Sequence, residues 1–110
     1  VRPLIKGRPY GFTFNLSQDP DFGDWTDGSF VMQAKIAPGT SNPVAATFAC
    51  TTGTPVGLLT PVNVSLDVSD QTNIPEIGHE LVYEFSFVPT GGGRNIVFAG
   101  IVPLAEGVIQ

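Results

Sequence analysis

The amino-acid sequence predicts an all-β domain, and three observations carry that prediction. Short segments alternate apolar and polar residues with a period of two, which is the pattern of a half-buried strand. Turn-forming residues separate these segments, and the chain contains 13 glycines and 10 prolines among 110 residues. No window of ten or more residues shows the 3.6-residue period of a helix. A chain of this length has room for one domain.

Three strands are predicted in the first half of the chain. The first begins near Tyr10 and places three apolar side chains on one face: Phe12, Phe14 and Leu16. The second places four on one face: Phe30, Met32, Ala34 and Ile36. The third covers residues 46–51 and pairs Phe48 with Cys50 on one face. Each run is as long as an ordinary strand.

Three further strands are predicted in the second half. The clearest alternation puts four aliphatic side chains on one face: Val62, Val64, Leu66 and Val68. The next places mainly aromatic side chains on one face: Leu81, Tyr83, Phe85 and Phe87. The last covers residues 96–102 and is apolar at nearly every position, so we expect it to be buried on both faces.

The segments between these strands contain residues that favour turns. Residues 70–75 are expected to form one short helical turn, with Ser69 or Asp70 as its cap. Six or seven short strands at this spacing predict an antiparallel sandwich or a small barrel. The simplest form is an immunoglobulin-like β-sandwich of about seven strands, covering residues 10–103.

The two ends of the chain lack this alternation. Residues 1–9 contain three of the five basic residues and are expected to form an extended N-terminal arm. Residues 104–110 are expected to form a short, mildly apolar tail. Because the alternation begins at Tyr10, we expect the core not to require the arm. No secretory signal pattern opens the chain.

Composition argues against several classes of function. The net charge of −5 and a pI near 4.4 argue against a nucleic-acid-binding surface. No apolar run approaches the roughly 20 residues of a membrane span, so no membrane partner is expected. The single cysteine, Cys50, excludes an intrachain disulfide and a cysteine-based metal cluster.

An acidic segment is the one candidate for metal binding. Four carboxylates fall within nine positions, at Asp19, Asp21, Asp24 and Asp27. Clustered carboxylates suit Ca²⁺, but Gly23 and Phe30 occupy positions where an EF-hand loop has acidic ligands. A solvated, turn-forming loop is therefore favoured, and no metal or other cofactor is expected. Cation binding at this loop is left open.

Residues with catalytic potential do not form a recognisable motif. His79 stands alone, and Cys50 alternates in phase with Phe48, as a small core residue does. Residues 91–94 read Gly-Gly-Gly-Arg but lack the Lys-Ser/Thr ending of a phosphate loop and precede a predicted strand. A hairpin turn is the better interpretation of this glycine run. The sequence therefore predicts a protein that is not an enzyme.

Trp25 lies among turn residues and has two interpretations that the sequence leaves equal. With Phe22 and Tyr10 it forms an exposed platform on which a sugar ring stacks, or it folds back to close one end of the core. The first interpretation makes a carbohydrate-binding β-sandwich module the alternative function.

The order of these features is similar to that of a known family. The relevant segments are Phe12–Leu16, the turn Trp25–Gly28, the strand Phe30–Ile36, the corner Thr72–Pro75, and residues 82–85 and 98–102. Over residues 8–103 they resemble the immunoglobulin-like domain of bacteriophage tail and baseplate proteins, of the type found at the N-terminus of baseplate upper proteins. Asp27, inserted before the turn glycine, and Glu84-Phe85, in place of the usual Asp, depart from the pattern.

This resemblance implies a non-enzymatic structural protein of a phage virion, in the tail, baseplate or collar or on the capsid surface. Its partners are expected to be other virion proteins and copies of itself, held by weak contacts that symmetry repeats. The basic arm and apolar tail are the segments expected to reach those neighbours. The expected contact residues are Arg2, Leu4, Ile5, Lys6, Arg8, Leu104, Val108 and Ile109.

Overall fold

The computed structural model describes residues 3–19, 21, 24–37, 43–74 and 80–105. These contain six strands: β1 (Tyr10–Ser17), β2 (Gly28–Lys35), β3 (Val44–Thr52), β4 (Leu59–Leu66), β5 (Glu80–Pro89) and β6 (Asn95–Pro103). Each strand overlaps a segment that the period-two alternation predicts. The helical content of the described chain is one 3-10 turn, η1 (Val68–Asp70). The all-β prediction is therefore confirmed.

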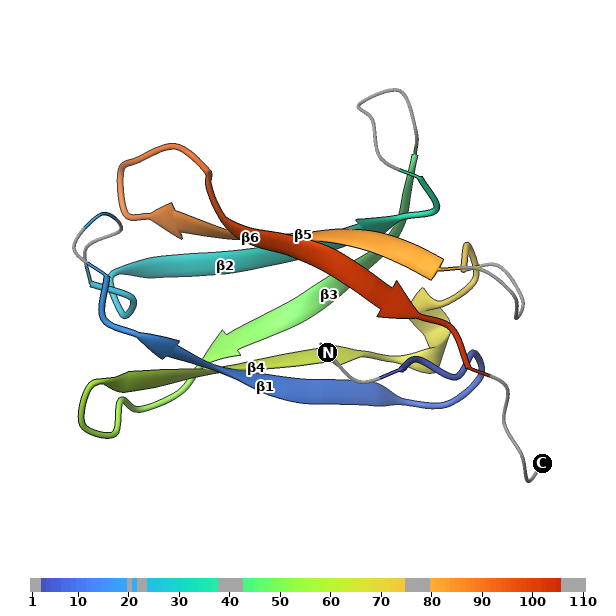
Figure 1. Cartoon of the computed structure of the whole chain (residues 1–110), viewed down its shortest axis with the longest axis horizontal. Helices are drawn as coiled ribbons and strands as arrows, with labels where there is room; N and C mark the ends of the chain where they lie inside the picture. The colour runs from blue at the N-terminus through green and yellow to red at the C-terminus, as the bar shows by residue number, and fades with distance from the viewer. Residues whose placement is uncertain (1–2, 20, 22–23, 38–42, 75–79, 106–110) are drawn as a thin grey trace.

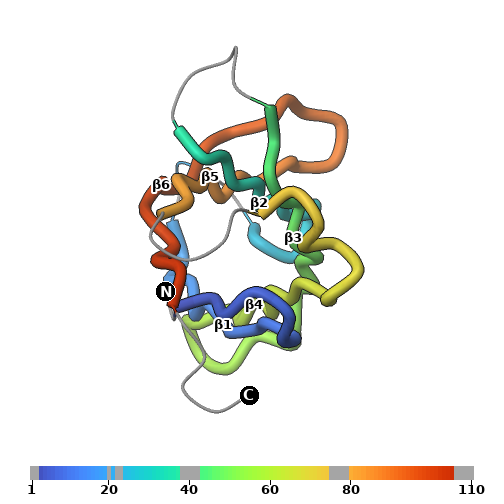
Figure 2. The backbone as a smooth tube through the Cα atoms, turned by 90° about the vertical axis from the view of Figure 1, so that its right-hand side faces the viewer, coloured from blue at the N-terminus to red at the C-terminus, as the bar shows by residue number. Residues whose placement is uncertain are grey.

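The strands form one antiparallel sheet in the order β1-β4-β3-β2-β5-β6, curled into a half-barrel (Figures 1 and 2). β3 is the corner of this sheet. Its residues 44–48 pair with β2, whereas residues 49–52 pair with β4. A strand that changes partner in this way turns one part of a sheet over the other. As a result, β1 and β4 face β2, β5 and β6 across the core.

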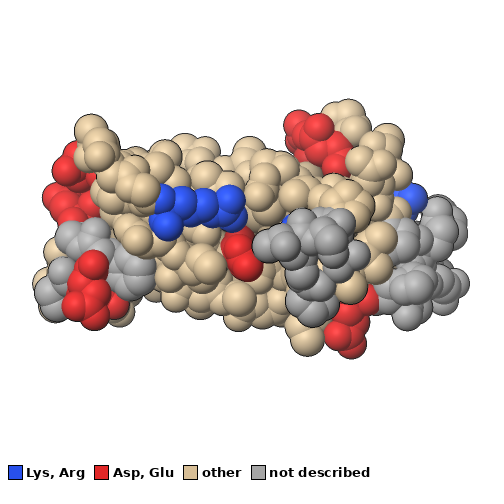
Figure 3. All heavy atoms as spheres, turned by 90° about the horizontal axis from the view of Figure 1, so that it is seen from above, with Lys and Arg blue, Asp and Glu red and all other residues tan. Residues whose placement is uncertain are grey.

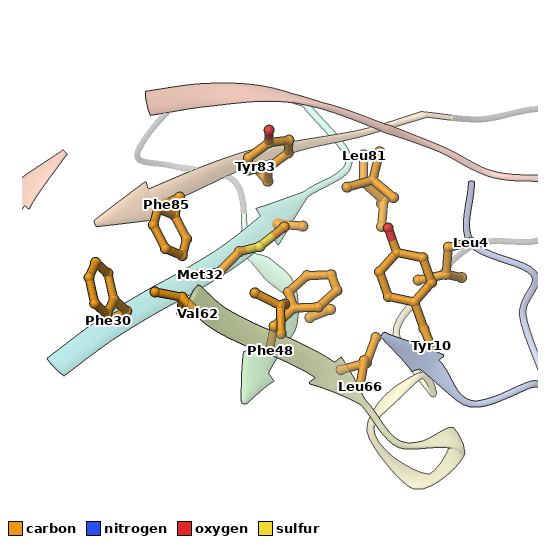
Figure 4. Close-up of a cluster of buried hydrophobic side chains, with 14 of the residues drawn as sticks. Leu4, Tyr10, Phe30, Met32, Phe48, Val62, Leu66, Leu81, Tyr83 and Phe85 are labelled. Carbon is orange, nitrogen blue, oxygen red and sulfur yellow. The ribbon is translucent and has the colours of Figure 1, made fainter. Parts of the chain in front are cut away.

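The core between these two parts combines aliphatic side chains with a cluster of aromatic rings (Figure 4). Phe85 of β5 lies at its centre, stacked on Phe30 with ring centroids 5.1 Å apart and on Phe98 at 5.0 Å. Phe14 of β1 meets Phe85 at 4.7 Å and Phe98 at 4.8 Å. Since β1 and β6 are the two edges of the sheet, the Phe14–Phe98 contact joins the edges through side chains.

One residue of the segment before β1, Leu4, belongs to the core. Leu4 is 0% exposed. Its N–H donates to the carbonyl of Pro103, and its carbonyl accepts from the N–H of Ala105, both at 2.9 Å. The single parallel bridge between Leu4 and Leu104 therefore fastens the segment beside the end of β6. This packing contradicts the expectation that the core begins at Tyr10.

A buried glutamine holds the same segment from the other side. The Gln71 side chain accepts a hydrogen bond from the N–H of Gly7 at 2.8 Å and donates one to the carbonyl of Arg8 at 2.7 Å. Gln71 follows η1, which begins at Val68, before the start predicted for the helical turn. The N-terminal cap of η1 is Asp67, not Ser69 or Asp70.

The last strand differs from its prediction. Phe85 pairs with Phe98 but the next residue, Ser86, pairs with Ile96, so Val97 is an extra residue in β6. This β-bulge shifts the alternation and turns Ile96 outward. Ile96 is 55% exposed and Ile101 is 51% exposed. The expectation that this strand is buried on both faces is wrong, because β6 is an edge strand with an open outer face.

Candidate interaction surface

The connections between strands gather at two ends of the half-barrel. One end, which we call the acidic end, contains the β1–β2, β3–β4 and β5–β6 connections. It carries four carboxylates, those of Asp19, Asp21, Asp24 and Asp27. The described part of the opposite end is mixed, with three basic residues (Lys6, Arg8, Lys35) and three acidic ones (Asp67, Asp70, Glu80). Negative charge is therefore concentrated at one end of the half-barrel.

The contact residues predicted in the arm and tail are placed as follows. The side chain of Leu4 lies inside the chain's own core, which removes it from the set available to a neighbour. Ile5 and Lys6 are half-buried, Arg8 is exposed, and the half-buried Leu104 packs against the core. The remaining three, Arg2, Val108 and Ile109, lie outside the described residues.

Two of the carboxylates at the acidic end, Asp24 and Asp19, accept hydrogen bonds within their own turns. Asp24 accepts hydrogen bonds from the N–H of Thr26 at 2.9 Å and from its hydroxyl at 2.7 Å. These two bonds, the backbone one first, lower the pKa of Asp24. Asp19 accepts from the N–H of Asp21 at 3.0 Å. Among the described residues, no three His, Cys, Asp or Glu side chains converge as metal ligands would.

The candidate catalytic residues can be placed only in part. Cys50 is half-buried against the core, and burial raises the pKa of its thiol to about 11. Such a thiol stays neutral near pH 7 and is a poor nucleophile. His79 lies outside the described residues.

Trp25 folds back into the core, which is the second of the two interpretations that its sequence allows. Its indole is 3% exposed, and its Nε1 donates a hydrogen bond to the carbonyl of Ser17 at 2.8 Å. The ring packs edge-on against Phe87 with centroids 5.2 Å apart. Tyr10 is buried as well, and Phe22 lies outside the described residues. Because Trp25 and Tyr10 are both buried, neither ring is exposed as the stacking platform of a carbohydrate-binding module requires.

The glycine run forms the hairpin turn between β5 and β6, as predicted. Gly92 N–H donates to the carbonyl of Pro89 at 3.0 Å, and Gly91 has a φ of 76°, a conformation that favours glycine. Arg94 follows this turn, and its side chain lies over β5. Its Nε donates to the hydroxyl of Ser86 at 3.0 Å, and its Nη2 lies 4.0 Å from an Oε2 of Glu84.

These side chains belong to what we call the outer face, the outward-facing residues of β2, β5 and β6 together with Arg94. Figure 3 views the molecule from this side. The strand register arranges the face in three rows across the strands. One row is Lys35, Val82 and Ile101; the middle row is Gln33, Glu84 and Ala99; the third is Val31, Ser86 and Ile96. Rows containing the isoleucines thus flank a polar middle row.

Arg94 covers the centre of the outer face. Ser86, although it faces outward, is fully buried, and its hydroxyl is bonded to Arg94. The guanidinium also reaches Gln33, whose Oε1 accepts from Nη1 at 3.4 Å, and Gln33 in turn donates to Thr47 of β3 at 3.4 Å. The polar row is therefore a connected network with isoleucines on either side.

A second apolar feature projects from the acidic end. We call residues 56–59, the tight turn between β3 and β4, the apolar tip. Val56 and Leu59 exchange two backbone hydrogen bonds of 2.8 and 3.1 Å, and Gly57 has a φ of 62°. Glycine at the first central position is typical of a tight hairpin turn. The turn leaves Val56 76% exposed and Leu58 78% exposed.

Sequence reasoning did not single out the outer face or the apolar tip. Two signals in the sequence point to them. Residues 95–103 contain no charged residue, although edge strands are usually protected by charge. Residues 56–59 read Val-Gly-Leu-Leu at a hairpin turn, where polar residues are usual. The position of Ile96 on the outer face depends on the β-bulge at Val97, which the local sequence pattern does not predict.

Comparisons with known proteins add no relative, since no protein-family model matches the chain and no curated protein is significantly similar to it.

Proposed function

We propose that this chain is a non-enzymatic structural protein that works by assembly, as a small module of a phage virion. The observation that supports assembly is the apolar tip, where a short, doubly hydrogen-bonded turn holds two large aliphatic side chains out from the body. The virion, and a place in its tail, baseplate, collar or capsid surface, rest on the family resemblance of residues 8–103. The immunoglobulin-like sandwich is proposed on the same resemblance.

The curled sheet is compatible with a sandwich. β3 divides its pairing between β2 and β4, so two groups of strands face each other across one core. The Leu4–Leu104 bridge adds a short pairing beside β6, outside the six named strands. These features support a two-layered β-domain whose neighbours contact its loops and outer surfaces.

The apolar tip is suited to a contact that is weak alone and repeated many times. Full burial of an aliphatic side chain of this size contributes about 1.5–3 kcal/mol. The backbone of the turn is already ordered, because the N–H of Gln18 also donates to the carbonyl of Leu58 at 3.2 Å. A preorganised tip loses little conformational entropy on docking. Copies in a symmetric array then sum these contacts.

Competitive incorporation tests this proposal. Cells that produce the particle would receive equal amounts of the wild-type chain and of Leu58→Asp, with Ser65→Asp as the control at an exposed position of β4. We expect purified particles to contain the wild type and the control at a fixed copy number, and Leu58→Asp to be depleted. Absence of the wild-type chain from particles would overturn the virion assignment. Equal incorporation of Leu58→Asp would remove the tip as a contact.

A further inference from the structure

We infer that the outer face is a two-fold contact between two copies of this chain. The inference rests on the proposed assembly function and assigns one of its contacts to named residues. It concerns a surface separate from the apolar tip, which lies at one end of the half-barrel.

Exposed aliphatic side chains at a sheet edge are the first observation. Ile96 and Ile101 stand on the outer side of β6, and each is about half exposed. Val82, the neighbour of Ile101 on β5, and Val31, the neighbour of Ser86 on β2, are half-buried on the same face. Large aliphatic side chains exposed on one face of a sheet are suited to a contact site.

Charge is the second observation, and it selects a copy of the chain as the occupant. At a net charge of −5, two copies repel each other over most approaches. The outer face is balanced in charge, since it has two basic residues (Lys35 and Arg94) and two acidic ones (Glu80 and Glu84), and it adjoins the opposite end, whose described charges also balance. Copies can therefore approach through this face with little net repulsion. The acidic end, with four aspartates, cannot serve two identical copies in this way.

The row pattern is the third observation, because it is self-complementary. A two-fold axis that lies in the plane of the contact and runs along the middle row places the Ile96 row of one copy over the Ile101 row of the other. The same axis brings Arg94 of each copy toward Glu84 of the second copy. Inside one chain these two groups are 4.0 Å apart and exposed, so their mutual attraction is small. A guanidinium has enough donors to bond both carboxylates.

The size of the face determines the strength of the contact. Over the length of the eight-residue strand β2, the three strands cover roughly 14 by 27 Å, or about 400 Å² in projection. A stable complex buries about 800 Å² on each partner. The outer face alone therefore gives a weak dimer in solution, which becomes stable only where other contacts hold the copies together.

Sedimentation equilibrium from micromolar to millimolar concentration tests the inference on the full chain. We expect the wild type to show a weak monomer–dimer equilibrium. Ile101→Asp should weaken dimerisation by about tenfold or more, because it puts a charge where the contact buries an apolar side chain. Val56→Asp, the same type of change on the apolar tip, should dimerise as the wild type does. Circular dichroism confirms that each variant is folded.

Charge exchange gives a second readout that a folding defect does not imitate. Glu84→Arg alone and Arg94→Glu alone should each weaken the dimer, because each gives the face a net charge. The double variant E84R/R94E restores opposite charges and should recover dimerisation. A monomeric wild type at millimolar concentration would overturn the inference. Unchanged dimerisation of Ile101→Asp, or its loss in Val56→Asp alone, would do so as well.

These outcomes are distinguishable from failure of the proposed function. A chain that enters particles but stays monomeric in solution refutes the contact through the outer face and leaves the assembly function intact. A chain that dimerises through Ile101 but is absent from particles refutes the virion assignment and leaves the contact intact.

Discussion

Replacing Leu4 with alanine is the sharpest test of how the N-terminal segment contributes to stability. Leu4 is fully buried and packs in the core (Figure 4), although the sequence places it outside the region of alternating residues. The substitution keeps the two backbone hydrogen bonds to Pro103 and Ala105, because they involve only the main chain. The change therefore measures the packing of one side chain.

The expected loss follows from that complete burial. Truncating a buried leucine to alanine costs about 2–5 kcal/mol, of which part is the cavity that remains. In a chain of about this size, each kcal/mol lowers the melting temperature by roughly 4–8 °C. We therefore expect Tm to fall by at least about 8 °C. Ile5→Ala, at the half-buried neighbouring position, should cost clearly less.

Urea unfolding followed by tryptophan fluorescence provides the assay. The chain has one tryptophan, Trp25, which is buried in the folded state and reports its exposure on unfolding. Equal and small losses for Leu4→Ala and Ile5→Ala, below about 0.5 kcal/mol, would refute the placement of Leu4 in the core. Deletion of residues 1–9 should then also be harmless, whereas our reasoning predicts that it strongly destabilises the fold.

Four further tests have defined expectations. Gln71→Ala leaves the Gly7 N–H and the Arg8 carbonyl without their partner and should cost about 1–3 kcal/mol in urea unfolding; a loss near zero would contradict that bridge. Gly28→Ala would bring a Cβ to 2.4 Å from the backbone oxygen of Val88, so calorimetry should show a lower Tm, while Gly93→Ala, where a Cβ meets nothing within 4 Å, should not. The Cys50 thiol should alkylate slowly until the pH nears its raised pKa of about 11. Because this pKa lies above the ordinary value of 9.0, the stability that the neutral thiol contributes is complete below pH 9 and is lost as the pH rises through 11. Fast alkylation at pH 8 would show that the thiol is not desolvated. EDTA should leave Tm unchanged if the acidic loop is only solvated, whereas a drop reversed by Ca²⁺ would show a bound cation.

Local patterns predict the strands because alternation and turn chemistry are properties of neighbouring residues. The six described strands follow the predicted segments, and the Gly91–Gly93 run forms the predicted hairpin turn. Local patterns do not predict the role of Gln71, whose side chain bonds to Gly7 and Arg8 more than 60 residues away. They do not predict the burial of Leu4 either, since its hydrogen-bond partners, Pro103 and Ala105, lie near the other end of the sequence.

The candidate surfaces were less predictable than the strands. The exposure of Ile96 depends on an extra residue at Val97, which shifts the face of the strand by one position. The local sequence around Arg94 resembles part of a phosphate loop, but the position of its side chain follows from contacts with β2 and β5. The choice between the two roles of Trp25 needed the position of the Ser17 carbonyl and of Phe87. Each of these features is set by tertiary packing.

An electron cryo-microscopy map of the purified particle would show which surfaces of this chain its neighbours cover. We expect copies related by symmetry, with the apolar tip buried against another virion protein and with Ile96 and Ile101 of paired copies in contact. A map in which both surfaces face solvent in every copy would contradict assembly through these surfaces.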